Sequence, residues 1–234
     1  MHRPDLNALP ADERTLLAGL IQQYTTPNII RIHRDAIISG AHNNPVTFLS
    51  FHRNYIGGLE AFLLELAQSR WVPLPAWNPV EPIPREFNIP DAGLDRLRNL
   101  NPNVSFSPEF DQENLPNFRT VEELGQALMA RHNLVHSRIG GVMNNLQRAP
   151  EAPIFWPFHS YIDDIWWEWQ RLTVAVPSCI GMSFSEAEKM LGFCGLGIKK
   201  MGHIPYDSGW NRIKGQQPAP LTMAARETPV RLYY

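Results

Sequence analysis

The amino-acid sequence predicts one mainly helical domain with long proline-rich loops. Apolar residues recur at helical spacing in several long segments, and many of the 21 prolines fall between those segments. No internal repeat or low-complexity tract divides the chain, and 234 residues are enough to bury a substantial core. We therefore expect a single domain over residues 1–234.

Three helices are expected before residue 70. Acidic residues open the segment 12–25, and leucine, isoleucine and tyrosine recur along one helical face of it. The segment 28–39 continues with isoleucines at similar spacing. The third helix, over 46–68, is long and carries aromatic residues at helical spacing, although Gly57 and Gly58 weaken it locally.

A proline-rich segment separates these helices from the later ones. The stretch 72-VPLPAWNPVEPIPREFNIPD-91 holds six prolines, which predicts an extended loop. Residues 92–117 show no persistent period. Substrate selectivity is expected to reside in these loops, which carry no readable motif.

Three further helices follow. The fourth is expected from about residue 120 to 139, where Gly140 and Gly141 end it. The fifth spans roughly 157–172. A shorter helix over 185–193 begins with a Ser/Glu capping pattern. The remaining residues read as loops and short strands.

Composition excludes several classes of partner. The formal net charge is −2, only 19% of residues are charged, and no basic run indicates nucleic-acid binding. No apolar stretch approaches the roughly 18 residues that span a bilayer, and no signal-peptide pattern opens the chain. We expect a soluble protein without nucleic-acid or membrane partners, either cytoplasmic or secreted after signal removal. Cys179 and Cys194 permit one disulfide and leave the compartment open.

The histidines carry the chemical signal of the chain. His132 and His136 lie one helical turn apart, yet Asn133 occupies the position where zinc proteases place their glutamate base. His52 and His159 fall on apolar helical faces beside aromatic residues. Burying several imidazoles together is costly unless their nitrogens are satisfied. The full set is His2, His33, His42, His52, His132, His136, His159 and His203.

The ligand type narrows the choice of metal. Sites built from imidazole alone suit copper or zinc better than calcium, magnesium or an iron–sulfur cluster. A di-iron bundle would need Glu-x-x-His pairs, but Met129 and Asn133 occupy the positions three before His132 and His136. Six histidines in two groups of three point to two metal ions, and redox chemistry would favour copper.

Three stretches resemble the type 3 copper proteins, the family of tyrosinases, catechol oxidases and hemocyanins. The resemblance lies in 42-HNNPVTFLSFHRNYIGGLE-60, 132-HNLVHSRIGGVM-143 and 153-PIFWPFHSYIDDIWWEWQR-171, with 3-RPDLNALPADE-13 similar to the family's lead-in. It covers residues 3–171, which implies a catalytic core there and a loop-rich extension over 172–234. It implies a four-helix bundle that holds two copper ions and uses O₂.

The resemblance also assigns ligands. His33, His42 and His52 would hold one copper, and His132, His136 and His159 the other. Some positions depart from the family pattern: the His33–His42 spacing is short, and Phe158 replaces the first member of a His-His pair. Gly40 stands where some members carry a cysteine, which excludes a thioether link to His42.

Further site residues follow from the same resemblance. Glu123 and Asn133 match a Glu/Asn pair that holds a water to deprotonate a monophenol, although Thr120-x-x-Glu123 also reads as a capping box. Ser137, Gly141 and Met143 would line the substrate rim; the glycine is equally a helix stop, and the methionine equally core filling. Asp163 would either orient a ligand imidazole or be an exposed charge.

These features predict a copper oxidase that uses O₂ to hydroxylate monophenols and oxidise o-diphenols to o-quinones. A catechol or o-aminophenol oxidase without monophenolase activity is the first alternative. A hemocyanin-like O₂ carrier is the second, disfavoured by the short stretch after Gln170. The third is a zinc-bound or metal-free binding module on the same scaffold. A small phenol is the expected partner, while a copper-delivery partner and the oligomeric state stay open.

Overall fold

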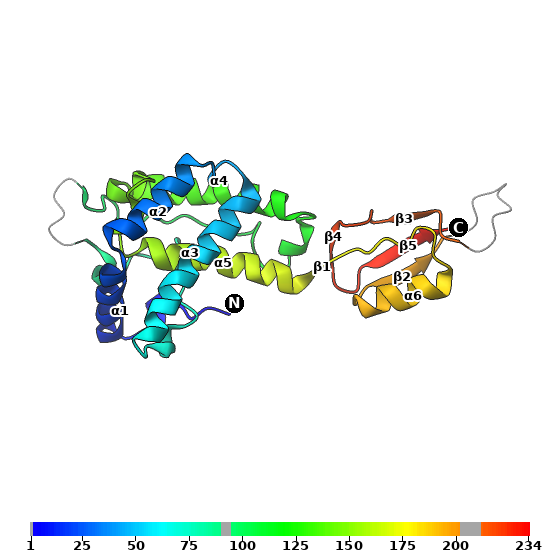
Figure 1. Cartoon of the computed structure of the whole chain (residues 1–234), viewed down its shortest axis with the longest axis horizontal. Coiled ribbons are helices and arrows are strands. Elements are labelled where there is room, and N and C mark those ends of the chain that lie inside the picture. The colour runs from blue at the N-terminus through cyan, green and yellow to red at the C-terminus, as the bar shows by residue number, and fades with distance from the viewer. Residues whose placement is uncertain (1, 90–94, 202–211) are drawn as a thin grey trace. The chain divides into compact units, whose positions relative to one another are not determined.

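A computed structural model describes residues 2–89, 95–201 and 212–234, and the mainly helical fold class is confirmed (Figure 1). The chain divides into two compact units. The first consists of Met1–Pro108 and Val121–Trp167, and the second of Glu109–Thr120 and Glu168–Tyr234.

Five long helices form in the chain, close to the expected bounds. They are α1 (Ala11–Tyr24), α2 (Pro27–Ile38), α3 (Pro45–Glu65), α4 (Val121–Ile139) and α5 (Phe155–Leu172). In the first unit, α2, α3, α4 and the larger part of α5 lie together, while α1 packs against α3 (Figure 1). The regular four-helix bundle stays a prediction.

Capping residues in the local sequence set where helices α2 and α3 begin. The Thr26 side chain accepts a hydrogen bond from the Ile29 backbone N–H, and Pro27 occupies the first helical position of α2. Asn44 caps α3 in the same way, accepting from the Thr47 backbone N–H at 2.9 Å, again followed by a proline. These caps fix the starts of both helices and therefore the side chains that each presents to the core.

Two glycines allow close backbone approach beside α4. A Cβ atom at Gly125 would lie 2.8 Å from the Pro45 carbonyl oxygen, so glycine lets the start of α3 contact α4 directly. Gly141, with φ of +59°, would place a Cβ atom 1.9 Å from the Arg96 carbonyl oxygen. The loop before α4 therefore crosses the glycine pair that ends this helix.

The proline-rich segment is part of the core. Its described residues form only one short 3₁₀ helix, η3 (Arg85–Phe87), as the prolines predict. Trp77 is fully buried, its backbone N–H donates to Pro157 O at 3.0 Å, and its indole N–H donates to Pro82 O at 3.2 Å. The segment thus packs against the start of α5. The other 3₁₀ helices are η1 (Leu6–Ala8), η2 (Ser69–Trp71), η5 (Leu115–Asn117), η6 (Gly141–Asn144) and η7 (Ala149–Glu151).

The second unit contains more regular structure than the expected loops. Its elements are β1 (Thr173–Ala175), α6 (Phe184–Phe193), β2 (Gly197–Lys200), β3 (Gly215–Gln217), β4 (Met223–Ala225) and β5 (Pro229–Tyr233). Strands β1 and β4 pair antiparallel, and β5 lies between parallel β2 and antiparallel β3. The capping box of α6 is made by Ser183 and Glu186, two residues earlier than the sequence pattern indicated.

The core of the second unit is apolar. Its members include Leu191 of α6 and both Val230 and Leu232 of β5. Cys179 is buried in this core and Cys194 packs against it, and both are free thiols. None of the described helices is long and apolar enough to cross a membrane.

Candidate metal centre

Six histidines converge inside the first unit. His33 comes from α2, His52 from α3, His132 and His136 from consecutive turns of α4, and His159 from α5. His42 lies in the turn between α2 and α3 and is partly exposed, whereas each of the other five is at most 2% exposed.

The histidines form two adjoining groups. In the first triad (His33, His42 and His52) the ring centroids lie 5.0–5.5 Å apart. In the second triad (His132, His136 and His159) they lie 4.3–5.6 Å apart. The triads meet where the rings of His52 and His159 stack at 4.4 Å, with 21° between their planes.

Ligand-atom distances support the first triad as a metal site and link it to the second. One nitrogen from each member of the first triad lies within 4.8 Å of the others, and the same holds for His52, His132 and His159. His136 is not part of the latter group, although its ring is 4.3 Å from that of His132. His52 thus lies close enough to contribute to either half of the centre.

Helix geometry orients two of the rings. The Nδ1–H of His52 donates to the carbonyl oxygen of Phe48 at 2.8 Å, and that of His159 donates to Phe155 at 2.7 Å. In each pair the acceptor is one turn earlier in the same helix. Because a carbonyl can only accept, Nδ1 carries the proton and Nε2 keeps its lone pair.

The α4 histidines are oriented by different acceptors. His136 Nδ1 donates to the carbonyl oxygen of Met143 at 2.5 Å. His132 Nδ1 lies 3.0 Å from Asn133 Oδ1. If that oxygen is the acceptor, Nε2 of both rings is again free to bind a cation.

The Nε2 atoms of four histidines face one another in two pairs. His132 Nε2 lies 3.1 Å from His159 Nε2, and His52 Nε2 lies 3.4 Å from His33 Nε2. With the protons of His132 and His159 on Nδ1, two lone pairs face each other in the first pair; they repel, and a cation between them removes the repulsion. Among the residues that the structure describes, the buried His42 Nε2 and His136 Nε2 atoms have no hydrogen-bond partner, which is a costly state for a polar atom. The residues therefore fit a bound metal.

Burial keeps these imidazoles neutral. It is the main cause that lowers the pKa of His33 from 6.5 to about 2, and the pKa values of His42 and His136 to about 4. Burial, reinforced by the charges of neighbouring histidines, also holds the pKa values of His52, His132 and His159 well below 6.5. Neutral imidazole is the form that binds metals. A set of imidazoles alone suits copper or zinc.

The structure separates Glu123 from Asn133. Both residues lie on the unbroken helix α4, where ten residues correspond to about 15 Å along the axis. The two side chains and two hydrogen bonds of about 3 Å cannot bridge that separation. The shared water expected from the sequence is therefore incompatible with this helix. Asn133 is exposed and contacts His132, while Glu123 lies in the first turn of α4.

The expected substrate-rim residues occupy different environments. Ser137 is exposed on α4, one turn after Asn133. Gly141 is half-buried beneath the Arg96 carbonyl. The Met143 side chain is fully buried, and its backbone oxygen holds the His136 ring. Their roles toward a substrate stay predictions.

Among the described residues Asp163 pairs with arginines rather than with an imidazole, and it is not exposed. It is 6% exposed and binds Arg3 and Arg53. Sequence reasoning also missed the carbonyls of Phe48, Phe155 and Met143. The first two could have been anticipated, because a buried helical histidine can donate to the carbonyl one turn earlier.

Comparisons with known proteins agree with this geometry. The family model described as the common central domain of tyrosinase matches residues 93–172. The chain is 27% identical over 211 residues to hemocyanin beta-C chain unit D of Helix pomatia, covering 73% of this chain and 51% of that protein. It is 50% identical over 40 residues to the tyrosinase of Streptomyces antibioticus, covering 17% of this chain and 14% of that enzyme.

A third relative is a tyrosinase of Hahella sp. (strain CCB-MM4), 43% identical over 47 residues, or 20% of this chain and 10% of that protein. The chain thus spans about half the length of the hemocyanin unit and shorter shares of the tyrosinases. No solved structure matches the chain significantly.

Proposed function

We propose that this chain, which is similar to the tyrosinase/hemocyanin superfamily of type 3 copper proteins, is a two-copper oxidase that uses O₂ to oxidise phenols. One observation carries the proposal. Six imidazoles, five of them fully buried, form two adjoining triads in which Nε2 atoms face one another at 3.1 and 3.4 Å. The first triad would hold one copper and the second triad the other.

The reaction is the oxidation of o-diphenols to o-quinones. Each diphenol loses two electrons and two protons, so two diphenols reduce one O₂ to two waters. Bound copper supplies the redox capacity for this transfer. The protein keeps its imidazoles neutral through burial and holds four of the rings through their Nδ1 atoms.

Aromatic side chains exclude water from the ligands. The Phe155 ring lies 3.9 Å from that of His159, and the Phe48 ring lies 4.7 Å from that of His52 and 4.9 Å from that of His132. Both phenylalanines are fully buried. A water-poor environment strengthens electrostatic interactions with a bound cation and limits side reactions.

Monophenol hydroxylation is the finer part of the proposal. A monophenol and O₂ give an o-quinone and water, but the phenol, with a pKa of about 10, must first lose its proton. Asn133 supports this step: it is exposed beside His132, and with Oδ1 facing the ring its amide N–H group can hold a water. Glu123 does not share that water in the α4 helix, so Asn133 would act without it.

Reversible O₂ binding is a second candidate function. The hemocyanin unit aligns over 211 residues, far more than the 40 to 47 residues of the tyrosinase alignments, although at lower identity. A carrier and an oxidase would share the copper ligands. They differ in whether a phenol reaches the metals and is consumed.

Turnover measurements on copper-loaded protein distinguish these functions. We expect O₂ consumption and quinone formation with a catechol, and slower turnover of the matching monophenol. Catechol oxidation without monophenol turnover would identify a catechol or o-aminophenol oxidase. O₂ binding without oxidation of any phenol would identify a carrier. Failure to bind copper, or binding of zinc alone, would contradict the proposal.

A further inference from the structure

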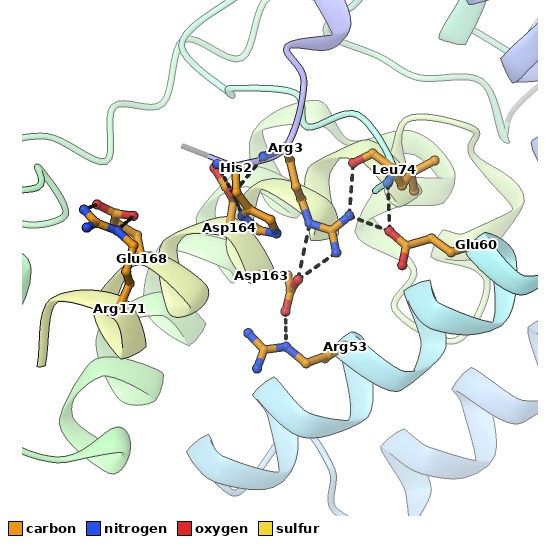
Figure 2. A network of polar contacts seen from close by, with 9 residues as sticks. All are labelled: His2, Arg3, Arg53, Glu60, Leu74, Asp163, Asp164, Glu168 and Arg171. Carbon is orange, nitrogen blue, oxygen red and sulfur yellow. Dashed lines mark hydrogen bonds and ion pairs between the residues drawn. The ribbon is translucent and has the colours of Figure 1, made fainter. Parts of the chain in front are cut away.

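A buried network of ion pairs joins α3 to α5 (Figure 2). Asp163 of α5 binds Arg53 of α3, with Nε and Oδ1 2.5 Å apart. Its other oxygen binds the Arg3 guanidinium at 2.8 and 3.3 Å. Arg3 in turn binds Glu60 of α3 at 2.6 Å and the Leu74 carbonyl oxygen at 3.1 Å.

The charges in this network balance, and most are shielded from water. The side chains of Arg3 and Asp163 are each 6% exposed, that of Glu60 is 19% exposed and that of Arg53 is 32% exposed. Two guanidinium groups therefore face two carboxylates. Removing one partner of such a buried set leaves an uncompensated charge, so the contacts constrain the distance between the helices strongly.

The network lies beside the contact between the triads. Arg53 directly follows His52, and Asp163 lies one helical turn after His159. These two histidines belong to different triads, and their rings stack at 4.4 Å. A change in the spacing of α3 and α5 would change the separation of the triads, even if each triad stayed intact.

We propose that Asp163, held between Arg53 and Arg3, is a positioning residue that sets the separation of the two copper-binding triads. The inference rests on the proposed function, because it concerns how two metals act together. Reaction with O₂ at both metals depends on their separation, and misplacement by about 1 Å can cost roughly a hundredfold in rate. Binding of each copper depends mainly on the three histidines of its own triad and on the contacts that orient their rings.

Asp164 provides a matched control. It neighbours Asp163 on α5 and is equally buried, at 2% against 6% exposure. Its carboxylate accepts hydrogen bonds from the backbone N–H groups of His2 and Arg3, at 3.0 and 3.1 Å, and also contacts the His2 ring. It therefore attaches the N-terminal segment to α5, and within the described residues its hydrogen bonds and ion pair go to that segment and not to α3.

The test compares Asp163→Asn with Asp164→Asn in the full copper-loaded chain. Three quantities are measured: copper per chain, melting temperature without metal, and the near-ultraviolet absorption that appears when O₂ is added. We expect Asp163→Asn to keep both coppers but lose at least about tenfold of the O₂-dependent absorption. Asp164→Asn should keep both coppers and at least half of the absorption, even if its melting temperature falls as far as that of Asp163→Asn.

The inference is overturned if the two variants lose the absorption equally, or if Asp163→Asn keeps it. If Asp163→Asn does not fold, Arg53→Lys replaces it; this variant keeps the charge but loses the planar guanidinium group, and the same selective loss is expected. Wild-type protein without two coppers or without the absorption would instead refute the proposed function itself.

Discussion

The two triads differ in how firmly the fold holds them. In the second triad every Nδ1 atom has a polar contact: His132 with Asn133, His136 with Met143 and His159 with Phe155. In the part of the chain that the structure describes, His52 is the one member of the first triad with a comparable bond. The buried His33 Nδ1 atom has no hydrogen-bond partner there, although the backbone of Leu146 partly offsets the lowering of the His33 pKa by burial.

The two triads are held differently because different structural elements carry their histidines. All three members of the second triad come from helices α4 and α5, whereas His42 comes from a turn and is partly exposed. Contacts to the second ring nitrogen fix the orientation of a ligand and raise its basicity. The second triad is therefore arranged before the metal arrives, and the first triad must lose more freedom when copper binds.

The largest expected effect comes from removing a ligand of the prearranged triad. His159→Ala should abolish phenol oxidation and reduce the copper content to about one per chain, because two imidazoles remain where three are needed. Elemental analysis and O₂ uptake with a catechol measure both effects. Circular dichroism serves as the control for the helical fold. A variant that keeps full activity would show that His159 is not a ligand.

The difference between the triads predicts that they bind copper with unequal affinities. Titration against a competing chelator should show two steps, with the second triad binding on the order of 10–100-fold more tightly. His136→Ala should remove the tight step, and His42→Ala should remove the weak one. A single step with two equivalent sites, or loss of the tight step in His42→Ala, would contradict the difference between the triads.

Removing one contact to a ring nitrogen should lower the copper affinity of the second triad towards that of the first. Asn133→Ala removes the oxygen beside His132 Nδ1 and should weaken the tight copper step by roughly 10-fold. Asn133→Asp keeps an acceptor at this position and should retain the tight step. The same chelator titration applies. Equal affinities of the two variants would mean that Asn133 does not hold the ring.

The smallest effect is expected at Glu123. It lies about 15 Å along α4 from Asn133. Glu123→Gln should therefore change monophenol and catechol turnover alike, by less than about twofold, because general-base assistance is typically worth a hundredfold or more. Steady-state rates on both substrates decide this. A selective loss of monophenol turnover would restore Glu123 as part of the site.

Features that repeat locally were readable from the sequence, whereas long-range pairings were not. Helical spacing gave α3 and α4 within a few residues, and the motifs around His52, His132 and His159 indicated copper. The partner of Asp163 could not be anticipated, because Arg3 lies 160 positions away. The carbonyl acceptors of His52 and His159 follow from helical spacing, but nothing in the sequence marks Met143 as the acceptor for His136, since every residue carries a carbonyl.

The pairing of Glu123 with Asn133 rested on the resemblance alone. It did not take into account the axial rise of the helix expected over residues 120–139, and α4 continues unbroken through both positions. For the proline-rich segment, the local structure was predicted correctly but the burial was not. Its lack of helix was predictable, yet its burial depends on contacts such as Trp77 with Pro157 that only the folded chain reveals.

The central claim is that the six histidines hold two coppers that act together on O₂. The most direct measurement is the near-ultraviolet spectrum of the reduced, copper-loaded protein before and after O₂ is admitted, with copper per chain determined on the same sample. We predict about two coppers per chain and a strong new absorption that disappears when O₂ is removed. About one copper per chain, or two coppers with no response to O₂, would contradict the account.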